Sequence, residues 1–310
     1  MAIDTKEIYS AISRAQGEMT QAHFELVSIY LYEGQNSKYK DLDCNLILTY
    51  LIFKSLKLIN EKNLQYNYRE LLNINQFDPI NLKKSQIAID LNYPRETVRR
   101  NLNKLAKYDF IKVDNKEIFI NMNECLSNIN FERYKNSFNK IFLIILKNLK
   151  VDQKFDKPSI NLEKKFSLIW YYFLDMLINI SRVWKEYHKS LECWYIFGTC
   201  VLNQTYNSRD SGNLFSKDEN TTENFILNIT GTKSIRGLNP TTLSELTGIP
   251  RETVTRHLTK LLNNKTITKD KQNLFYFPST RVKRKNLIKN IEFVKNKVTE
   301  FIFKVTKTMN

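Results

Sequence analysis

Residues that interrupt helices are scarce in this chain of 310 residues, which has only 7 glycines and 6 prolines. Both residue types destabilise a helix interior, glycine by about 1 kcal/mol and proline by about 3 kcal/mol relative to alanine. Hydrophobic residues make up 42% of the chain and aromatic residues 12%, which favours a globular protein over a disordered one. The sequence therefore predicts a mainly α-helical globular protein.

Patterns typical of metal sites and of common enzymes are also missing. The three histidines are scattered, and no C-x-x-C pair occurs among Cys44, Cys125, Cys193 and Cys200. Zinc and iron–sulfur sites need ligands at closer spacing, so neither a metal nor a cofactor is predicted. Without a nucleophile–base pair, phosphate loop or paired-carboxylate motif, an enzyme is the least favoured class. The cysteines are expected to be buried, reduced thiols of a cytoplasmic protein.

Neither a signal peptide nor a membrane span is expected from the sequence. Asp4, Lys6 and Glu7 precede any apolar run at the N-terminus, which differs from a secretory signal. The most apolar stretch, 166–183, carries Asp175 and Asn179 near its middle. Because such groups are costly in lipid, this stretch predicts a buried bundle or interface helix, with no membrane partner.

Positive charge is in excess. Lys and Arg number 48 against 32 Asp and Glu, which gives a formal charge of +16. A chain of this charge favours a polyanionic partner, because neutralised phosphates release counterions. Lysine-rich solvated helix faces produce the same excess, so the charge alone does not identify the partner.

One phrase of ten residues occurs twice. Residues 93–102 and 249–258 are identical at seven positions, including the run Pro-Arg-Glu-Thr-Val. Upstream, Leu42-Asp43-Cys44 is matched by Leu191-Glu192-Cys193. This self-similarity predicts a duplicated unit, with one copy in residues 1–155 and the other in residues 156–310.

Helical periodicity fills most of both predicted units. In the first unit, helices are expected at about 5–33, ended by Gly34 as a C′ residue, at 42–60 and at 131–150, with a polar connector through Pro79. In the second unit they are expected at 165–187, 190–203 and 284–307. A polar connector from Gln204 to Leu238 is expected to be mobile and to hold about seven extra residues.

Around each phrase the pattern is that of a winged helix-turn-helix. In residues 82–121, Ser85 is expected to cap a helix, Asn92 to form the turn and Pro94 to open the next helix. Two strands, 110–113 and 117–120, would form the β-hairpin wing. The inward face of the second helix is predicted from the i, i+4, i+7 spacing of Val98, Leu102 and Leu105.

Residues 239–278 repeat this plan. Thr241 or Thr242 is expected to cap the first helix, and Gly248 to form the turn. The inward face of the second helix consists of Val254, Leu258 and Leu261. Strands at 266–268 and 274–277 would form the second wing.

The apolar stripes fix which residues of the two repeated helices face outward. In the first copy these are Arg95, Glu96, Arg99, Arg100 and Asn103, and in the second copy Arg251, Glu252, Thr255, Arg256 and Thr259. Arginine can bond to guanine O6 and N7, and glutamate can accept from cytosine N4, so these ten residues are predicted to read bases in the major groove. The alternative is that Glu96–Arg100 and Glu252–Arg256 are only i,i+4 surface pairs.

Arg-Glu-Thr-Val-x-Arg after a helix and a tight turn resembles the helix-turn-helix of the cyclic-AMP receptor protein and Fnr family. In that family the matching Arg, Glu and Arg read bases. The resemblance implies the same roles for Arg95, Glu96 and Arg100, and for their counterparts Arg251, Glu252 and Arg256. It covers about 40 residues in each half, the length of such a motif.

The sequence departs from that family elsewhere. It has neither a glycine-rich β-roll for a cyclic nucleotide nor a cysteine cluster like that of Fnr, and proline replaces the serine that usually precedes the Arg. The flanking helices resemble the helical dimerisation frame of MarR-type regulators. No effector is implied by either resemblance.

Eight further residues are predicted to contact phosphates. They are Ser85, Thr97, Lys112, Lys116, Thr242, Thr253, Lys269 and Lys271, although the lysines could be merely solvated and the hydroxyls could be helix caps. The copies differ where Arg99, Asn101 and Asn103 are replaced by Thr255, His257 and Thr259. The first copy is therefore expected to contribute more of the salt dependence of binding.

Aromatic residues cluster in one stretch of the second unit. Trp170, Trp184 and Trp194 fall within 25 residues of one another, and such a cluster favours a core or helix interface over an effector pocket. Cys193 and Cys200 lie at i and i+7 on one helix face, where packing is favoured over redox sensing.

These observations predict a fold of mainly α class, a duplicated unit of helical frame plus winged helix-turn-helix, with two small β-hairpin wings. The predicted function is that of a cytoplasmic transcription regulator that binds double-stranded DNA as a single-chain pseudo-dimer. A plasmid-type replication initiator with tandem winged helices and a winged-helix protein-interaction module are the alternatives. A homodimer through the helical frame and a contact with RNA polymerase are left open as further partners.

Overall fold

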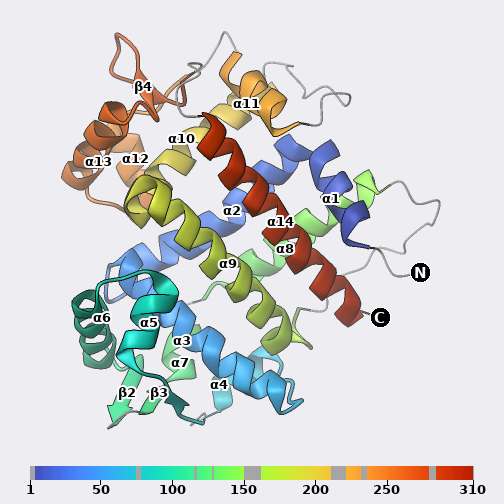
Figure 1. The fold of residues 1–310 in the computed structure, drawn as a ribbon, viewed down its shortest axis with the longest axis vertical. Coiled ribbons are helices and arrows are strands. Elements are labelled where there is room, and N and C mark those ends of the chain that lie inside the picture. The colour runs from blue at the N-terminus through green and yellow to red at the C-terminus, as the bar shows by residue number, and fades with distance from the viewer. Residues whose placement is uncertain are drawn as a thin grey trace.

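The computed structural model describes residues 4–74, 78–114, 117–127, 129–149, 162–210, 221–231, 236–278 and 284–309. Its elements are mainly helices, and small antiparallel sheets accompany them (Figure 1). The predicted mainly helical class is confirmed. In the described residues, no helix is both long enough and apolar enough to span a membrane. Below, the first half means residues 1–155 and the second half residues 156–310.

The first half begins with three helices, α1 (Thr5–Arg14), α2 (Gln16–Gln35) and α3 (Leu42–Glu61). The prediction of a single helix over 5–33 is wrong, because the chain leaves helical geometry at Ala15, where φ is −109°. Gly34 does not end the helix, since α2 continues to Gln35 and its C-cap is Asn36. Asp41 caps α3 by accepting from the backbone N–H groups of Asp43 and Cys44, each at 3.0 Å.

The connector between α3 and the first repeated phrase holds a helix that the sequence analysis did not predict. A short helix, α4 (Tyr68–Asn73), begins with a capping box formed by Asn67 and Glu70. These reciprocal side-chain bonds satisfy backbone N–H groups that a helix start leaves without partners. The predicted polar connector therefore contains a short helix.

The segment that contains the first phrase follows the predicted order. Strand β1 (Ile80–Asn81) leads to α5 (Lys84–Leu91), α6 (Arg95–Lys107), β2 (Ile111–Asp114) and β3 (Glu117–Ile120), and the strands form one sheet in the order β1-β3-β2. Asn92 adopts the left-handed conformation between the helices (φ 52°). Ser85 is not the helix cap, because α5 begins at Lys84 and has no side-chain cap.

Two helices complete the first half, α7 (Met122–Leu126) and α8 (Phe131–Asn148). The second half contains α9 (Phe166–His188), α10 (Leu191–Asp210), α11 (Thr222–Gly231), α12 (Pro240–Thr247), α13 (Arg251–Asn263) and α14 (Arg284–Met309). The prediction that 204–238 is a polar connector is wrong in part, since α10 extends into it and α11 lies within it. Its residues 211–220 and 232–235 lie outside the described residues.

The second repeated phrase also lies after a two-helix turn. Asn239, not Thr241 or Thr242, caps α12, and Pro240 occupies its first turn. Gly248 forms the turn with φ 70°, a conformation that favours glycine. A hairpin of β4 (Thr268–Lys269) and β5 (Phe275–Tyr276) follows α13, and Leu238 bridges to Phe275 of β5.

Helices from the two halves pack on one another in matched pairs. Within the halves, α2 packs on α8 and α9 on α14, while α3 packs on α6 and α10 on α13. Across the halves, α2 packs on α10 and α9 on α3. Each of these contacts therefore has a counterpart among the others.

Aromatic rings join the halves into one continuous core. The ring of Phe138 on α8 lies 5.2 Å from that of Phe173 on α9 and 5.6 Å from that of Phe301 on α14, centroid to centroid. Tyr134 meets Trp170 edge to face at 5.0 Å. The apolar stretch 166–183 lies in α9, and its charged residue Asp175 has a partner: its carboxylate binds Lys304 of α14 at 3.1 Å.

Gly34 permits the close approach of α2 and α3. A Cβ atom at this position would lie 2.3 Å from the side-chain nitrogen of Asn45. We expect Gly34→Ala to lower the free energy of unfolding by about 1–3 kcal/mol, because the helices would have to separate. Urea unfolding followed by circular dichroism measures this. Lys57→Ala, at an exposed position of α3, is the control and should change the value by at most about 0.5 kcal/mol. Equal values for the two variants would contradict the close-approach role.

Candidate nucleic-acid interface

Helix α6 is anchored by one face and leaves the other in solvent. Val98, Leu102 and Leu105 are buried against the protein. The five residues predicted to face outward are all exposed: Arg95, Glu96, Arg99, Arg100 and Asn103. Both α6 and α13 lie toward the left edge of Figure 1, at opposite ends of that side.

Helix α13 repeats the burial of α6 almost position by position. Val254, Leu258 and Leu261 are buried, and the five predicted outward residues are exposed: Arg251, Glu252, Thr255, Arg256 and Thr259. The same backbone therefore presents two arginines and a glutamate from each copy of the phrase.

The ion pairs on these helices differ from the predicted i,i+4 alternative. In α6 the Glu96 carboxylate binds the Arg99 guanidinium through two hydrogen bonds, at 2.8 and 2.6 Å. This contact lowers the pKa of Glu96 and raises that of Arg99. Among the described residues, no ion pair holds Arg100, Glu252 or Arg256. The charged groups of these three side chains are therefore open to a ligand.

The threonines of α13 bond to their own helix. The hydroxyl of Thr255 donates to the carbonyl of Arg251, and that of Thr259 donates to the carbonyl of Thr255, both at 3.0 Å. Their protons are thus engaged, although each oxygen can still accept. Because Thr255 stands where α6 has Arg99, the outward face of α13 is less cationic than that of α6.

A lysine from the second half supports the turn that precedes α6. The ammonium group of Lys185, on α9, donates to the carbonyls of Leu91 and Asn92, each at 2.8 Å. It also lies 3.3 Å from the centroid of the Tyr93 ring, and the Tyr93 hydroxyl donates to Asp43 at 2.6 Å. Burial lowers the pKa of Lys185 to about 8, against the opposing charge of Asp43. These contacts fix the angle at which α6 leaves the turn.

The turn before α13 receives support from the first half. Asn36, at the end of α2, lies against Gly248, where an added Cβ would come within 2.5 Å of its side-chain nitrogen. The hydroxyl of Tyr195 also reaches the carbonyls of Ser28 and Leu246, each at 3.4 Å. In both halves, therefore, the C-terminal end of a helix from the opposite half touches the turn.

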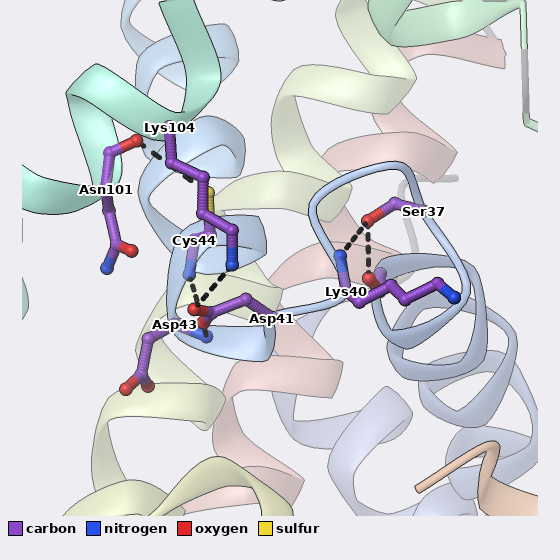
Figure 2. Close-up of polar contacts among 8 residues, drawn as sticks. Ser37, Lys40, Asp41, Asp43, Cys44, Asn101 and Lys104 are labelled. Atoms are coloured by element: carbon purple, nitrogen blue, oxygen red, sulfur yellow. Dashed lines mark hydrogen bonds and ion pairs between the residues drawn. The ribbon is translucent and has the colours of Figure 1, made fainter. Parts of the chain in front are cut away.

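Polar contacts tie α6 to the start of α3 (Figure 2). Lys104 of α6 binds the capping carboxylate of Asp41 at 3.2 Å, and the Cys44 thiol donates to the carbonyl of Asn101 at 3.8 Å. The side chain of Asn101 is fully buried, and its amide atoms have no partner among the described residues. Asn101 therefore acts in packing and not in contact with a ligand.

The same place in the second half holds a hydrogen-bonded histidine. His257 of α13 is 3% exposed. Its Nδ1 atom lies 2.9 Å from the sulfur of Cys193, and its Nε2 atom lies 2.6 Å from the carboxylate of Glu192, both on α10. Burial opposes protonation, but these two contacts raise the pKa of His257 to about 9. The sequence analysis counted the change from Asn101 to His257 among those that make the two helices bind DNA unequally. Both side chains are buried, so this part of the prediction is wrong.

The predicted phosphate contacts lie around the outward helix faces. Lys112 on β2, Lys269 on β4 and Lys271 after it are exposed, while Lys116 lies outside the described residues. The hydroxyl residues are half-buried: Ser85, Thr97, Thr242 and Thr253. Lys269 also approaches Asn273 at 3.3 Å. In the described part of the chain, neither a hydrogen bond nor an ion pair engages the ammonium group of Lys271.

Sequence reasoning did not find the residues that hold the two helices in place. Asp43 and Glu192 occupy the matched triplets Leu-Asp-Cys and Leu-Glu-Cys. That match was the one feature of the sequence that indicated a shared structural role for them. Lys185 carried no signal, because its partners lie more than 90 residues away.

No protein-family description matches this chain, and neither curated proteins nor solved structures show a significant similarity to it. The geometry of the site therefore carries the functional inference.

The buried histidine predicts a pH-dependent contribution to stability. Because the folded pKa of about 9 exceeds the usual value of 6.5, His257 stabilises the fold fully below about pH 6.5, and this contribution is lost as the pH rises through about 9. We expect His257→Asn to lower the free energy of unfolding by about 1–3 kcal/mol near pH 6.5. The loss should shrink by pH 9.5.

Urea unfolding at pH 6.5, 8 and 9.5 tests this pH dependence. Asn101→Ala changes the equivalent position of α6 without removing a titratable group, and it should keep the wild-type pH dependence. A constant difference between wild type and His257→Asn at all three pH values would contradict the assigned protonation.

Proposed function

We propose that this chain is a cytoplasmic transcription regulator that binds specific double-stranded DNA through α6 and α13. Each helix would enter a major groove as the recognition helix of a winged helix-turn-helix, and the two halves would form a single-chain pseudo-dimer. The observation that carries this proposal is the paired exposure of an identical Arg-Glu-x-x-x-Arg surface on two helices with the same buried face.

The chemistry of the exposed residues suits base reading. The guanidinium groups of Arg100 and Arg256 have no ion-pair partner among the described residues, so binding to guanine would break no existing pair. Two-pronged contacts of this kind contribute about 1–3 kcal/mol of discrimination per base. The cross-half contacts at the turns hold the helices before DNA arrives, which lowers the ordering cost of binding.

The strand arrangement behind each helix pair supports two related winged units. In the first half, β1 and β2 flank β3. In the second half, Leu238 and β4 flank β5 in the same way. Each hairpin follows its outward helix directly and carries exposed lysines, as a wing that contacts phosphate would.

The reciprocal packing supports a pseudo-two-fold relation between the halves. Helix α2 packs on α10 while α9 packs on α3, which is the pattern of an isologous contact between copies of one unit. Two recognition helices related in this way fit inverted half-sites. This favours an operator over the directly repeated sites of a replication initiator.

Loss of one arginine from each helix tests the base-reading role. Starting from a duplex selected out of a random pool, we expect Arg95→Ala with Arg251→Ala to weaken binding about 30-fold or more. Arg69→Ala with Arg133→Ala removes the same charge from exposed positions on α4 and α8 and should weaken binding much less. Equal losses of affinity in the two double variants would mean that the arginines act only through non-specific attraction of charge.

The arrangement of the selected site separates the alternatives. Two inverted blocks of unequal strength agree with a pseudo-two-fold regulator, whereas direct repeats would favour an initiator. Failure of salt-sensitive binding to any duplex would favour a protein-interaction module.

The unequal outward faces predict unequal electrostatic contributions. If Arg99 meets a phosphate, Arg99→Ala should reduce the slope of log affinity against log salt by about 0.9, and Thr255→Ala should leave that slope nearly unchanged. Fluorescence anisotropy from 50 to 300 mM salt (about the range over which such slopes are resolved) measures both variants. Equal changes in slope would refute the predicted asymmetry.

A further inference from the structure

A cavity of about 110 Å³ lies among α2, α10, α11 and α14, beside the C-terminal part of α9. Its walls are mostly apolar and aromatic, with Phe24, Trp184, Trp194, Phe197, Phe225 and Phe277 among them. An engineered apolar cavity of about 150 Å³ is large enough to bind benzene. The space here is smaller than that, but it is not fully enclosed, so a small single-ring molecule can enter with part of its surface at the opening.

Two residues on the wall of this cavity each carry a polar atom that has no partner among the described residues. His23 is 9% exposed and lines the cavity, and its Nε2 atom makes no hydrogen bond with the described residues. The same holds for Oε1 of Gln16, although the amide nitrogen of Gln16 donates to Thr222 at 3.1 Å. Buried polar atoms without partners are costly, so a ligand that supplies partners would be bound specifically.

The charges at the cavity favour a neutral ligand. Burial lowers the pKa of His23 to about 4, so this side chain is uncharged at pH 7. Lys295 also lines the cavity, but its ammonium group pairs with Glu292 at 3.3 Å and lies over the Tyr9 ring. An anionic ligand would have to displace this pair.

A second cavity occupies the corresponding place in the first half. Its wall includes Asn45, Leu48, Thr49 and Ile52 of α3, at the positions that Trp194, Phe197, Gly198 and Val201 hold on α10. That cavity is larger, about 350 Å³, and has more polar walls. The space beside this helix therefore recurs in both halves, with aromatic residues on both walls, and its lining is less polar in the second half.

We propose that the apolar cavity binds an uncharged, single-ring alcohol or amide. The ring would contact the aromatic walls, and the hydroxyl or N–H group would hydrogen-bond Nε2 of His23. This binding is separate from the proposed DNA-binding function and can be measured on the free protein.

The position of the cavity links it to the second winged unit. Trp194 on its wall adjoins Cys193, which contacts His257 of α13. Phe277, also on the wall, follows β5 and is fixed through its backbone N–H to Gln204 at 2.9 Å. A ligand between them would contact both supports of the second helix–hairpin unit.

Tryptophan fluorescence gives a direct binding test, because Trp184 and Trp194 both lie on the cavity wall. The full chain is titrated with benzyl alcohol, with toluene and with benzoate. We expect benzyl alcohol to bind about fivefold to tenfold more tightly than toluene, which has the ring but no hydroxyl. Benzoate, the anion of similar size, should bind most weakly. No saturable change with any probe, or the tightest binding by benzoate, would overturn the proposal.

His23→Phe separates ligand binding from a structural role. The substitution keeps a ring but removes the partnerless nitrogen, so the fold should be equally or more stable while the preference for benzyl alcohol over toluene falls to about twofold or less. His188→Phe is the matched control. His188 is 5% exposed and its Nε2 atom also has no partner, but it does not line the cavity. That variant should keep the full preference, and an equal loss in both variants would refute the assigned role of His23.

Discussion

The structure depends on the packing of α2 and α9, each of which is buried against helices of both halves. Helix α2 contacts α8 and α10, and α9 contacts α14 and α3. Because apolar side chains occupy most sides of these helices, neither half could bury its own surface if the other were removed. Helix α6 packs on α3 and α13 packs on α10. Because α3 and α10 each pack against a helix of the opposite half, the orientation of α6 and α13 depends on this shared core.

Local patterns predicted the repeated segments well, because the relevant information lies within a few residues. The inward faces of α6 and α13, the left-handed Asn92 and Gly248, and the order of helices and strands all follow from spacing and backbone chemistry. The buried positions Asn101 and His257 show where apolar spacing alone does not identify the buried face. They occupy i+3 of an i, i+3, i+4, i+7 stripe, but their polar character removed them from the predicted core.

Other errors have a similar origin in effects that a short window does not contain. Ala15 is a good helix former, so the break between α1 and α2 has no local signal. Gly34 resembles a helix end, yet its role is to admit Asn45 from a neighbouring helix. The candidate interface was predictable as a set of exposed side chains. Its supports, such as Lys185, were not, because they come from the other half.

The contact of Lys185 with the turn before α6 also shows how the two turns can change in sequence independently of each other. In a homodimer, every interface substitution is made twice, so one residue must suit both sides. Here the opposite turn is met by Asn36 instead, and Gly248 takes the place of Asn92. With both interfaces encoded in one chain, each turn can be adjusted by mutation without altering its counterpart. The two ends of the molecule are thereby free to specialise separately while they continue to share one core.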